Sequence, residues 1–303
     1  ERLIDPRSPD RRPRRAAYAL PTLFTAGNVF LGFYALIQIF QGALGAVQNL
    51  AGAPLHFQAA AVAIGVAVVL DGLDGRIARM TSTVSEFGRE MDSLADVITF
   101  GIAPTVLAFA WGVQFVSSPS SLIPIEHLRR LGYFCSFVFL LCGAMRLARF
   151  NIQRNPVPKN PGRPDRKYFV GLPIPAAAAV VAGIVFAFGS APIRWWLPSA
   201  IWLALLFLLS FLMVSTWRYP SFKDVNLLKP RSPLTLVMFG ILIFMIWFYP
   251  QPVLLMLSLC YLATGILIRV GGVLRRKVRA RSRGKLEEQA GLERRAAAER
   301  RIG

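Results

Sequence analysis

The sequence predicts an all-α, polytopic integral membrane protein with eight spans. Of its 303 residues, 54% are hydrophobic and only 17% are charged, and the mean hydropathy is +0.49. Soluble globular chains are nearer a quarter charged. The apolar residues also come in long blocks, and basic residues flank these blocks. Together these observations exclude an ordinary soluble domain.

Eight apolar blocks account for the predicted spans, since a helix needs about 20 apolar residues to cross the hydrocarbon core. They are 20–43, 57–80, 87–115, 129–152, 171–189, 195–216, 233–249 and 251–273. No internal repeat and no Gly/Ser linker divides them. We therefore expect one membrane domain over 16–274 between two polar tails, 1–15 and 275–303.

The two tails carry +10 of the formal net charge of +19. Residues 1–15 hold six Arg against three acids, and residues 275–303 hold eleven Lys and Arg against four acids. Basic residues beside apolar spans indicate the positive-inside rule and attraction to anionic lipid rather than binding to nucleic acid. The segments after even-numbered spans are also rich in Lys and Arg. This pattern predicts a multi-pass protein of the cytoplasmic (inner) membrane with both termini in the cytoplasm.

Each tail permits a specific expectation. The basic N-terminal stretch before Pro21 predicts a short interfacial helix. For the C-terminal run 275–301, a surface helix and a solvated tail remain equally open.

Neither cysteine nor histidine indicates a metal site. Cys135, Cys142 and Cys260 lie inside apolar stretches, and their spacing fits neither a disulfide framework nor a zinc knuckle. His56 and His127 are expected on the outer side of the membrane, away from the acidic residues.

Carboxylates are concentrated in one short segment. Nine acids occur between residues 16 and 274, and six of them fall within 71–96. Because an ionisable side chain at membrane depth costs several kcal/mol unless it is paired or binds a metal, this cluster is a candidate functional site. Four aspartates stand at helix-compatible spacings of three and four: Asp71, Asp74, Asp92 and Asp96.

These spacings predict two helices that direct four carboxylates toward one site near the cytoplasmic surface. Aspartate oxygens without His or Cys select hard cations, Mg²⁺ or Mn²⁺. Four carboxylates are the number expected for two metal ions about 3.5–4 Å apart. Arg79 can offer a fork of donors to a phosphate. Gly75, Ala78 and Gly88 indicate either close helix packing or room for a ligand, and both interpretations remain open.

The segment from Asp71 to Asp96 fills every fixed position of the pattern D-x-x-D-G-x-x-A-R-x₈-G-x₃-D-x₃-D. This pattern resembles the signature of the CDP-alcohol phosphotransferase family. The stretches 86–104, 146–151 and 169–177 are similar to its phosphatidylserine synthase branch. The resemblance implies a six-helix core over 16–220, to which 221–274 would add two spans.

The resemblance also implies an activity: transfer of the phosphatidyl group from CDP-diacylglycerol to the hydroxyl of L-serine, with release of CMP. Asp71, Asp74 and Asp92 would be metal ligands, and Asp96 would be both a ligand and the base for serine. We expect direct in-line attack assisted by two metal ions. The nucleotide and its phosphates would contact Gly75, Ala78, Arg79, Gly88, Thr25 and Asn28. A homodimer is also implied.

Each of the polar residues outside the aspartate cluster has two possible roles. For Thr25 and Asn28, hydrogen bonding between helices is slightly favoured over ligand contact. Arg146 and Arg149, beside Asn151, can bind the serine carboxylate, although arginine at a span end also commonly snorkels. Lys167 is a candidate contact for lipid phosphate or for the headgroup surface.

Three other functions compete with this hypothesis. The same fold can serve another acceptor, such as glycerol 3-phosphate or inositol phosphate, although a phosphorylated acceptor would favour a more basic pocket. An ion transporter that uses aspartates as a relay is more distant, because its acids would be spread over several spans. A membrane prenyltransferase is equally distant, because a second Asp motif of the usual spacing is missing from the sequence.

Overall fold

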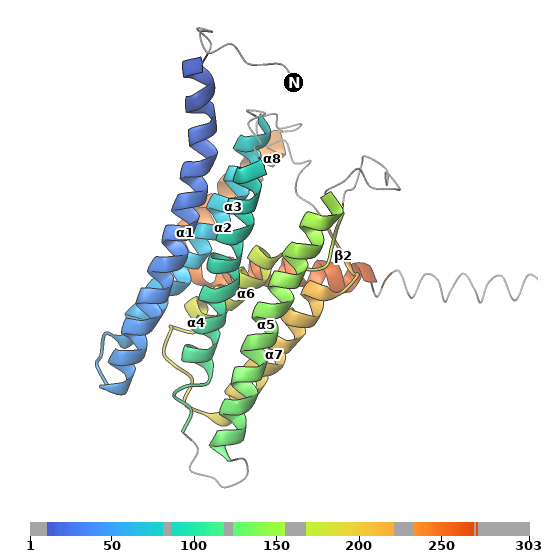
Figure 1. Cartoon of the computed structure of the whole chain (residues 1–303). Coiled ribbons are helices and arrows are strands. Elements are labelled where there is room, and N and C mark those ends of the chain that lie inside the picture. Colours follow the sequence, from blue (N-terminus) through green and yellow to red (C-terminus); the bar gives the residue numbers. More distant parts are fainter. Residues whose placement is uncertain are drawn as a thin grey trace, which may run out of the picture.

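Apolar segments form helices throughout the described part of the chain, which comprises residues 11–80, 86–117, 124–154, 168–220, 233–269 and 271. Figure 1 shows this computed structural model. The labelled α-helices are α1 (Arg11–Val47), α2 (Ala53–Met80), α3 (Glu86–Asp96), α4 (Ala103–Gly112), α5 (Ile125–Arg154), α6 (Ile174–Ala187), α7 (Trp196–Val214) and α8 (Pro233–Phe248). A further helix at Pro250–Arg269 is called the terminal helix below.

Six helical segments are long and apolar enough to cross a membrane. They are Leu23–Val47, Ala53–Leu73, Glu90–Gly112, Ile125–Ile152, Trp196–Val214 and Pro250–Arg269. The prediction of an all-α, polytopic membrane protein is confirmed.

Two of the eight predicted spans form shorter helices, α6 with 14 residues and α8 with 16. At 1.5 Å per residue, α6 is about 21 Å long, less than the thickness of the hydrocarbon core. Local backbone chemistry limits α6, because Pro173 is its N-cap and Gly171 just before it has a φ of +80°. Gly189, just beyond its C-terminal end, has a φ of +73°. The apolar run over 171–189 therefore combines an irregular entry with a short helix.

The short separate helix expected before Pro21 is instead the first part of α1, which extends over 37 residues. That expectation was wrong because a proline removes only one backbone hydrogen bond, and helices in membranes tolerate such a loss.

A π-helical turn at Val97–Ile102 joins α3 to α4. Pro104 explains its position, because a proline ring crowds the carbonyl four residues earlier in a regular α-helix and donates no N–H. In the wider turn, the Ala103 N–H donates to the Ile98 carbonyl. The Thr105 hydroxyl donates to the Gly101 carbonyl at 2.6 Å. The turn begins directly after Asp96.

A short antiparallel ribbon joins β1 (Tyr168–Val170) to β2 (Arg218–Pro220), with Phe169 opposite Tyr219. The Gly171 N–H then donates to the Trp217 carbonyl at 2.8 Å. The ribbon ties the chain that enters α6 to the chain that leaves α7.

The interior of the bundle lies around α4 and α6. Nearly every residue of α4 is buried, and α6 packs against α2. At the end away from the ribbon, the Trp202 indole donates to the Ala108 carbonyl at 3.0 Å, and the Ser199 hydroxyl donates to the Gly112 carbonyl at 2.7 Å. A Cβ at Gly112 would meet the Trp202 ring, so this close contact between α4 and α7 requires glycine.

Candidate active site

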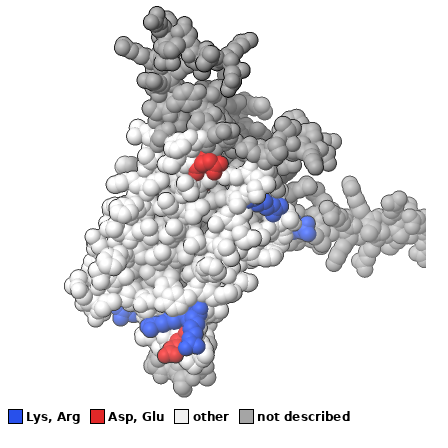
Figure 2. All heavy atoms as spheres, in the orientation of Figure 1, with Lys and Arg blue, Asp and Glu red and all other residues white. Residues whose placement is uncertain are grey.

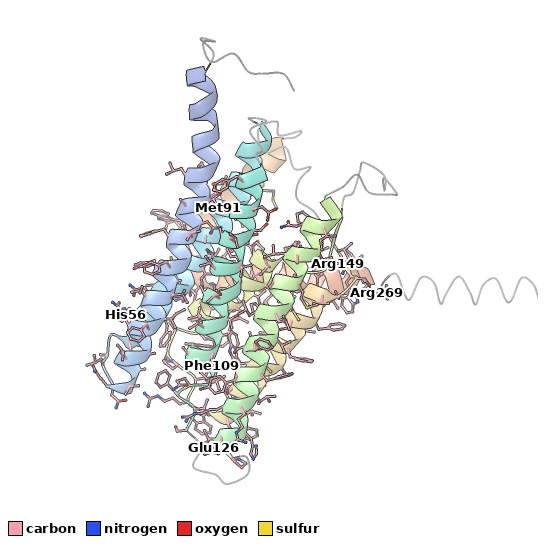
Figure 3. All side chains as sticks on the ribbon, in the orientation of Figure 1. His56, Met91, Phe109, Glu126, Arg149 and Arg269 are labelled. Carbon is pink, nitrogen blue, oxygen red and sulfur yellow. The ribbon has the colours of Figure 1, made fainter. Side chains whose placement is uncertain are left out.

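Three of the four predicted carboxylates come together at one end of the bundle. One oxygen from each of Asp71, Asp92 and Asp96 lies within 4.8 Å of the others. Asp71 lies on α2, and the other two lie one turn apart on the same face of α3. All three side chains are half-buried. Met91, which precedes Asp92, is labelled in Figure 3 toward the upper end of the bundle.

The remaining residues of the motif on α2 have a described backbone but no described side chains. This applies to Asp74, Gly75, Ala78 and Arg79. Gly88 lies on α3 and is half-buried, one turn before Asp92.

The three carboxylates form an electrostatically costly group. At about 4 Å and an effective dielectric constant near 20, two like charges repel each other by about 4 kcal/mol. A positive charge, from a bound cation, a proton or a basic side chain, must therefore offset part of this repulsion. Oxygen donors of this kind, without a described His or Cys beside them, match a hard divalent cation. The residues present thus fit the predicted Mg²⁺ or Mn²⁺.

The helix that carries Asp96 is held against α1 by a buried hydrogen bond. The Thr99 hydroxyl donates to the main-chain carbonyl of Asn28 at 2.9 Å. A Cβ at Gly32 would lie 2.5 Å from the Thr99 hydroxyl oxygen, so glycine permits this approach. The contact fixes the start of the π-helical turn, and with it the position of Asp96 on the preceding turn.

Asn28 and Thr25 are both buried, with 3% and 5% of their surface exposed. The bond from Thr99 reaches the main chain of Asn28, and the side-chain Oδ1 of Asn28 accepts no hydrogen bond from the described residues. A helix-to-helix hydrogen bond therefore exists here, but it leaves the amide oxygen of Asn28 available.

The two arginines near the end of α5 differ in their surroundings. Arg146 is half-buried and interacts electrostatically with Asp96. Its Nε is buried and has no acceptor among the described residues. Arg149 is exposed and is labelled beside α5 in Figure 3. Only Arg146 therefore joins the aspartates.

Asn151 connects the end of α5 to the helix of the aspartates. Its Nδ2 donates to the Ser93 hydroxyl at 2.9 Å, and Ser93 directly follows Asp92. The predicted candidate Asn151 thus lies beside the carboxylate group. Lys167, the candidate for lipid phosphate, lies outside the described residues.

One residue near the site was missing from the sequence prediction, Ser93. It had a usable signal, because it stands between two of the motif aspartates.

The histidine at the start of α2 lies away from this group. His56 Nδ1 is 2.7 Å from the side-chain oxygen of Gln38, and Figure 3 places His56 toward the opposite end of the bundle. His127 lies on the first turn of α5, the helix that carries Asn151 near its other end. These positions agree with the predicted separation of both histidines from the aspartates.

Comparison with known proteins extends these observations. The model of the family described as CDP-alcohol phosphatidyltransferase matches residues 18–209. This match includes the whole Asp71–Asp96 motif and ends before α8.

Several curated relatives are named CDP-diacylglycerol–serine O-phosphatidyltransferase. One from Helicobacter pylori (strain ATCC 700392 / 26695) is 38% identical over 215 residues, which are 71% of this chain and 77% of the relative. One from Bacillus subtilis (strain 168) is 30% identical over 204 residues, 67% of this chain and 91% of the relative. One from Saccharomyces cerevisiae is 38% identical over 159 residues, 52% and 50% of the two chains.

Proposed function

The chain belongs to the CDP-alcohol phosphatidyltransferase family, and on this premise we propose that it transfers the phosphatidyl group of CDP-diacylglycerol to L-serine. The observation that carries the proposal is the group of three carboxylates within 4.8 Å. The names of the relatives favour serine as the acceptor. In this proposal the chain is a membrane transferase. Its core comprises residues 16–220, and residues 221–274 add two helices.

Asp71, Asp92 and Asp96 would hold divalent cations, and Asp74 is expected to complete a set for two ions. When bound, such ions neutralise charge on the pyrophosphate and stabilise the departing CMP.

Asp96 acts as the base in this proposal. A serine hydroxyl is a weak nucleophile at neutral pH, and a carboxylate within hydrogen-bond reach can accept its proton. The serine oxygen then attacks in line the phosphorus that bears the diacylglycerol oxygen. A new bond forms between the serine oxygen and this phosphorus, the bond from phosphorus to the pyrophosphate bridging oxygen breaks, and CMP departs with that oxygen.

Arg146 is proposed to bind the serine carboxylate. Its Nε is buried without an acceptor among the described residues, and the guanidinium interacts with Asp96. An arginine can hold a carboxylate through two parallel hydrogen bonds. A carboxylate bound there would bring the hydroxyl of the same small molecule toward Asp96. Asn151 of α5 stabilises this part of the site through its hydrogen bond to Ser93. Arg149 is a second, more exposed candidate for binding the serine carboxylate.

The nucleotide is proposed to lie on the side of α1. The available amide oxygen of Asn28 and the buried Thr25 suit the cytosine ring, and the small residue Gly88 leaves space beside α3. Gly75, Ala78 and Arg79 of α2 would complete the contacts to CDP.

The placement in the cell follows from the charge distribution. Lys and Arg residues favour a cytoplasmic location for the site and both termini, in the inner membrane. Anionic lipid would attract the basic tails, and Lys167 is proposed as a contact for lipid phosphate. A homodimer is also part of the proposal.

An acceptor assay tests this function. Purified protein in vesicles that contain CDP-diacylglycerol should release CMP in the presence of Mg²⁺ or Mn²⁺ when L-serine is added. Glycerol 3-phosphate and inositol phosphate serve as alternative acceptors. Release with either of these but not with serine would contradict the serine assignment. Cation flux through the vesicles without any release of CMP would favour a transporter.

A further inference from the structure

The contact between α1 and the π-helical turn includes one buried polar side chain. Thr99 is fully buried, and its hydroxyl donates to the main-chain carbonyl of Asn28 at 2.9 Å. Asn28 lies inside α1, so that carbonyl also accepts the N–H of Gly32, four residues later, as part of the helix. A carbonyl oxygen has two lone pairs and can accept both bonds. The bond from Thr99 is therefore not needed to complete the backbone hydrogen bonding of α1, and it instead joins two separate helical segments.

Gly32 allows the two segments to approach at backbone distance. A Cβ at Gly32 would lie 2.5 Å from the Thr99 hydroxyl oxygen and 2.9 Å from the Thr99 Cα. Valine has nearly the same shape as threonine and would fill the same space, but only the hydroxyl makes a bond with a preferred distance and angle. The hydroxyl thus specifies the position of α1 along the turn.

Both sides of this bond carry groups of the candidate active site. Asp96 stands three residues before Thr99, at the N-cap of the π-helical turn. On α1, the side-chain amide oxygen of Asn28 is buried and accepts no hydrogen bond from the described residues. A buried amide oxygen without a donor requires an explanation. A ligand that contacts both α1 and the aspartates is the explanation that this arrangement supports.

We propose that Thr99 is a positioning residue for the donor substrate. Its bond to the Asn28 carbonyl holds α1 against the turn that follows Asp96, so that the amide of Asn28 and the cations at the aspartates bind the same molecule of CDP-diacylglycerol. The inference rests on the proposed function, in which α1 contacts the nucleotide and the aspartates hold the cations. Thr99 itself contacts no substrate in this proposal.

The chain offers a matched control at the other end of the bundle. Ser199 is fully buried, and its hydroxyl donates to the main-chain carbonyl of Gly112 on another helix at 2.7 Å. Gly112 is the last residue of α4, so its carbonyl has no donor within that helix. Ser199→Ala should therefore lower the thermal unfolding midpoint at least as much as Thr99→Val. A merely structural role of Thr99 would give the two variants similar kinetics.

Steady-state CMP release is measured while CDP-diacylglycerol and serine are varied in turn. Thr99→Val should raise the KM for CDP-diacylglycerol by about 3- to 10-fold, the range expected for the loss of one hydrogen bond. Its kcat and its KM for serine should stay within about 2-fold, because the contact of α1 with the nucleotide is a binding contact. Thr99→Ser keeps the hydroxyl and should retain the wild-type values, as should Ser199→Ala. An unchanged KM for CDP-diacylglycerol in Thr99→Val, or an equal rise in Ser199→Ala or in Thr99→Ser, would overturn the inference.

Titration calorimetry with CMP in the presence of Mg²⁺ separates this inference from the choice of acceptor. Thr99→Val should weaken the binding of CMP by the same factor of about 3 to 10, and Ser199→Ala should leave it unchanged. If the wild type uses glycerol 3-phosphate and not serine, the serine assignment fails, and this titration still decides the inference. Equal affinity of Thr99→Val and the wild type for CMP would overturn the inference alone. A wild type that neither releases nor binds CMP would overturn both proposals.

Discussion

The two ends of the bundle hold ionisable side chains in different arrangements. At the end where the last third of α2 lies beside α3, one oxygen from each of three half-buried aspartates lies within 4.8 Å of the others. At the start of α5, Glu126 lies 3.8 Å from Arg130, with 84% and 75% of their side chains exposed. Figure 3 labels Glu126 at the lower end, and Figure 2 shows acidic and basic atoms together there.

This difference shows which arrangement requires a functional explanation. An exposed pair of opposite charges one turn apart contributes little to stability and needs no ligand. Three like charges gathered in a half-buried position oppose folding, so a ligand or a reaction must account for their presence.

The largest effect is expected from the aspartates. Asp96→Asn should lower CMP release by about 10³-fold, because a missing base typically costs 10²- to 10⁴-fold. Asp92→Asn should also lower CMP release strongly, because it removes a proposed cation ligand. The unfolding midpoint should remain near that of the wild type or rise, since repulsion among the carboxylates decreases. Glu126→Gln is the matched control, with the charge removed at the other end. Near-normal rates in both aspartate variants would remove the proposed mechanism.

Removal of divalent cations should affect the end of the bundle that holds the three aspartates. A chelator should abolish CMP release, and Mg²⁺ or Mn²⁺ should restore it. Added cation at 100 times its dissociation constant should also stabilise the folded protein by about 2.7 kcal/mol. The unfolding midpoint measures this shift without substrate, and the shift should shrink in Asp92→Asn but not in Glu126→Gln. An identical shift in both variants would place the cation elsewhere.

A smaller effect is expected from the link between α5 and α3. Asn151→Ala removes the 2.9 Å hydrogen bond to Ser93, which is worth about 1 kcal/mol, or about 5-fold. We expect a rise of this size in the KM for serine. Ser93→Ala breaks the same bond from the other side, so the double variant should be no worse than either single variant. Fully additive effects would show that the two residues act independently.

The smallest effect is expected at the opposite end. Arg130→Gln and Glu126→Gln should each change the free energy of unfolding by less than about 1 kcal/mol, because both side chains are exposed. CMP release should stay unchanged. A marked loss of activity in either variant would mean that both ends of the bundle take part in the reaction.

Local patterns in the sequence were sufficient to predict the helices and the aspartate group. Apolar runs of about 20 residues predict spans because the bilayer imposes that length. Asp92 and Asp96 share a face because the helix repeat dictates it. The shortness of α6 was predictable in principle, since Pro173 precedes it and Gly189 follows it.

Contacts between distant segments were not predictable in this way. Hydropathy predicts that 251–273 is apolar, but not that Gly265 of the terminal helix packs against the Tyr219 ring, because side-chain packing decides which face of a helix meets the bundle. For the same reason, the sequence does not distinguish the surroundings of Arg146 from those of Arg149. Both stand near the end of α5, and only the folded chain shows that one joins the aspartates and the other is exposed.

The π-helical turn after Asp96 sets the direction of the acidic face of α3. One α-helical residue corresponds to a rotation of roughly 100°, and a π-helical turn accommodates one additional residue within a single turn. If all residues of Val97–Ile102 formed regular α-helix instead, α3 would be rotated by about that angle relative to α4. The carboxylates would then point away from Asp71 although every motif residue remained. The reaction therefore depends on the backbone form of an apolar stretch that contains no catalytic side chain.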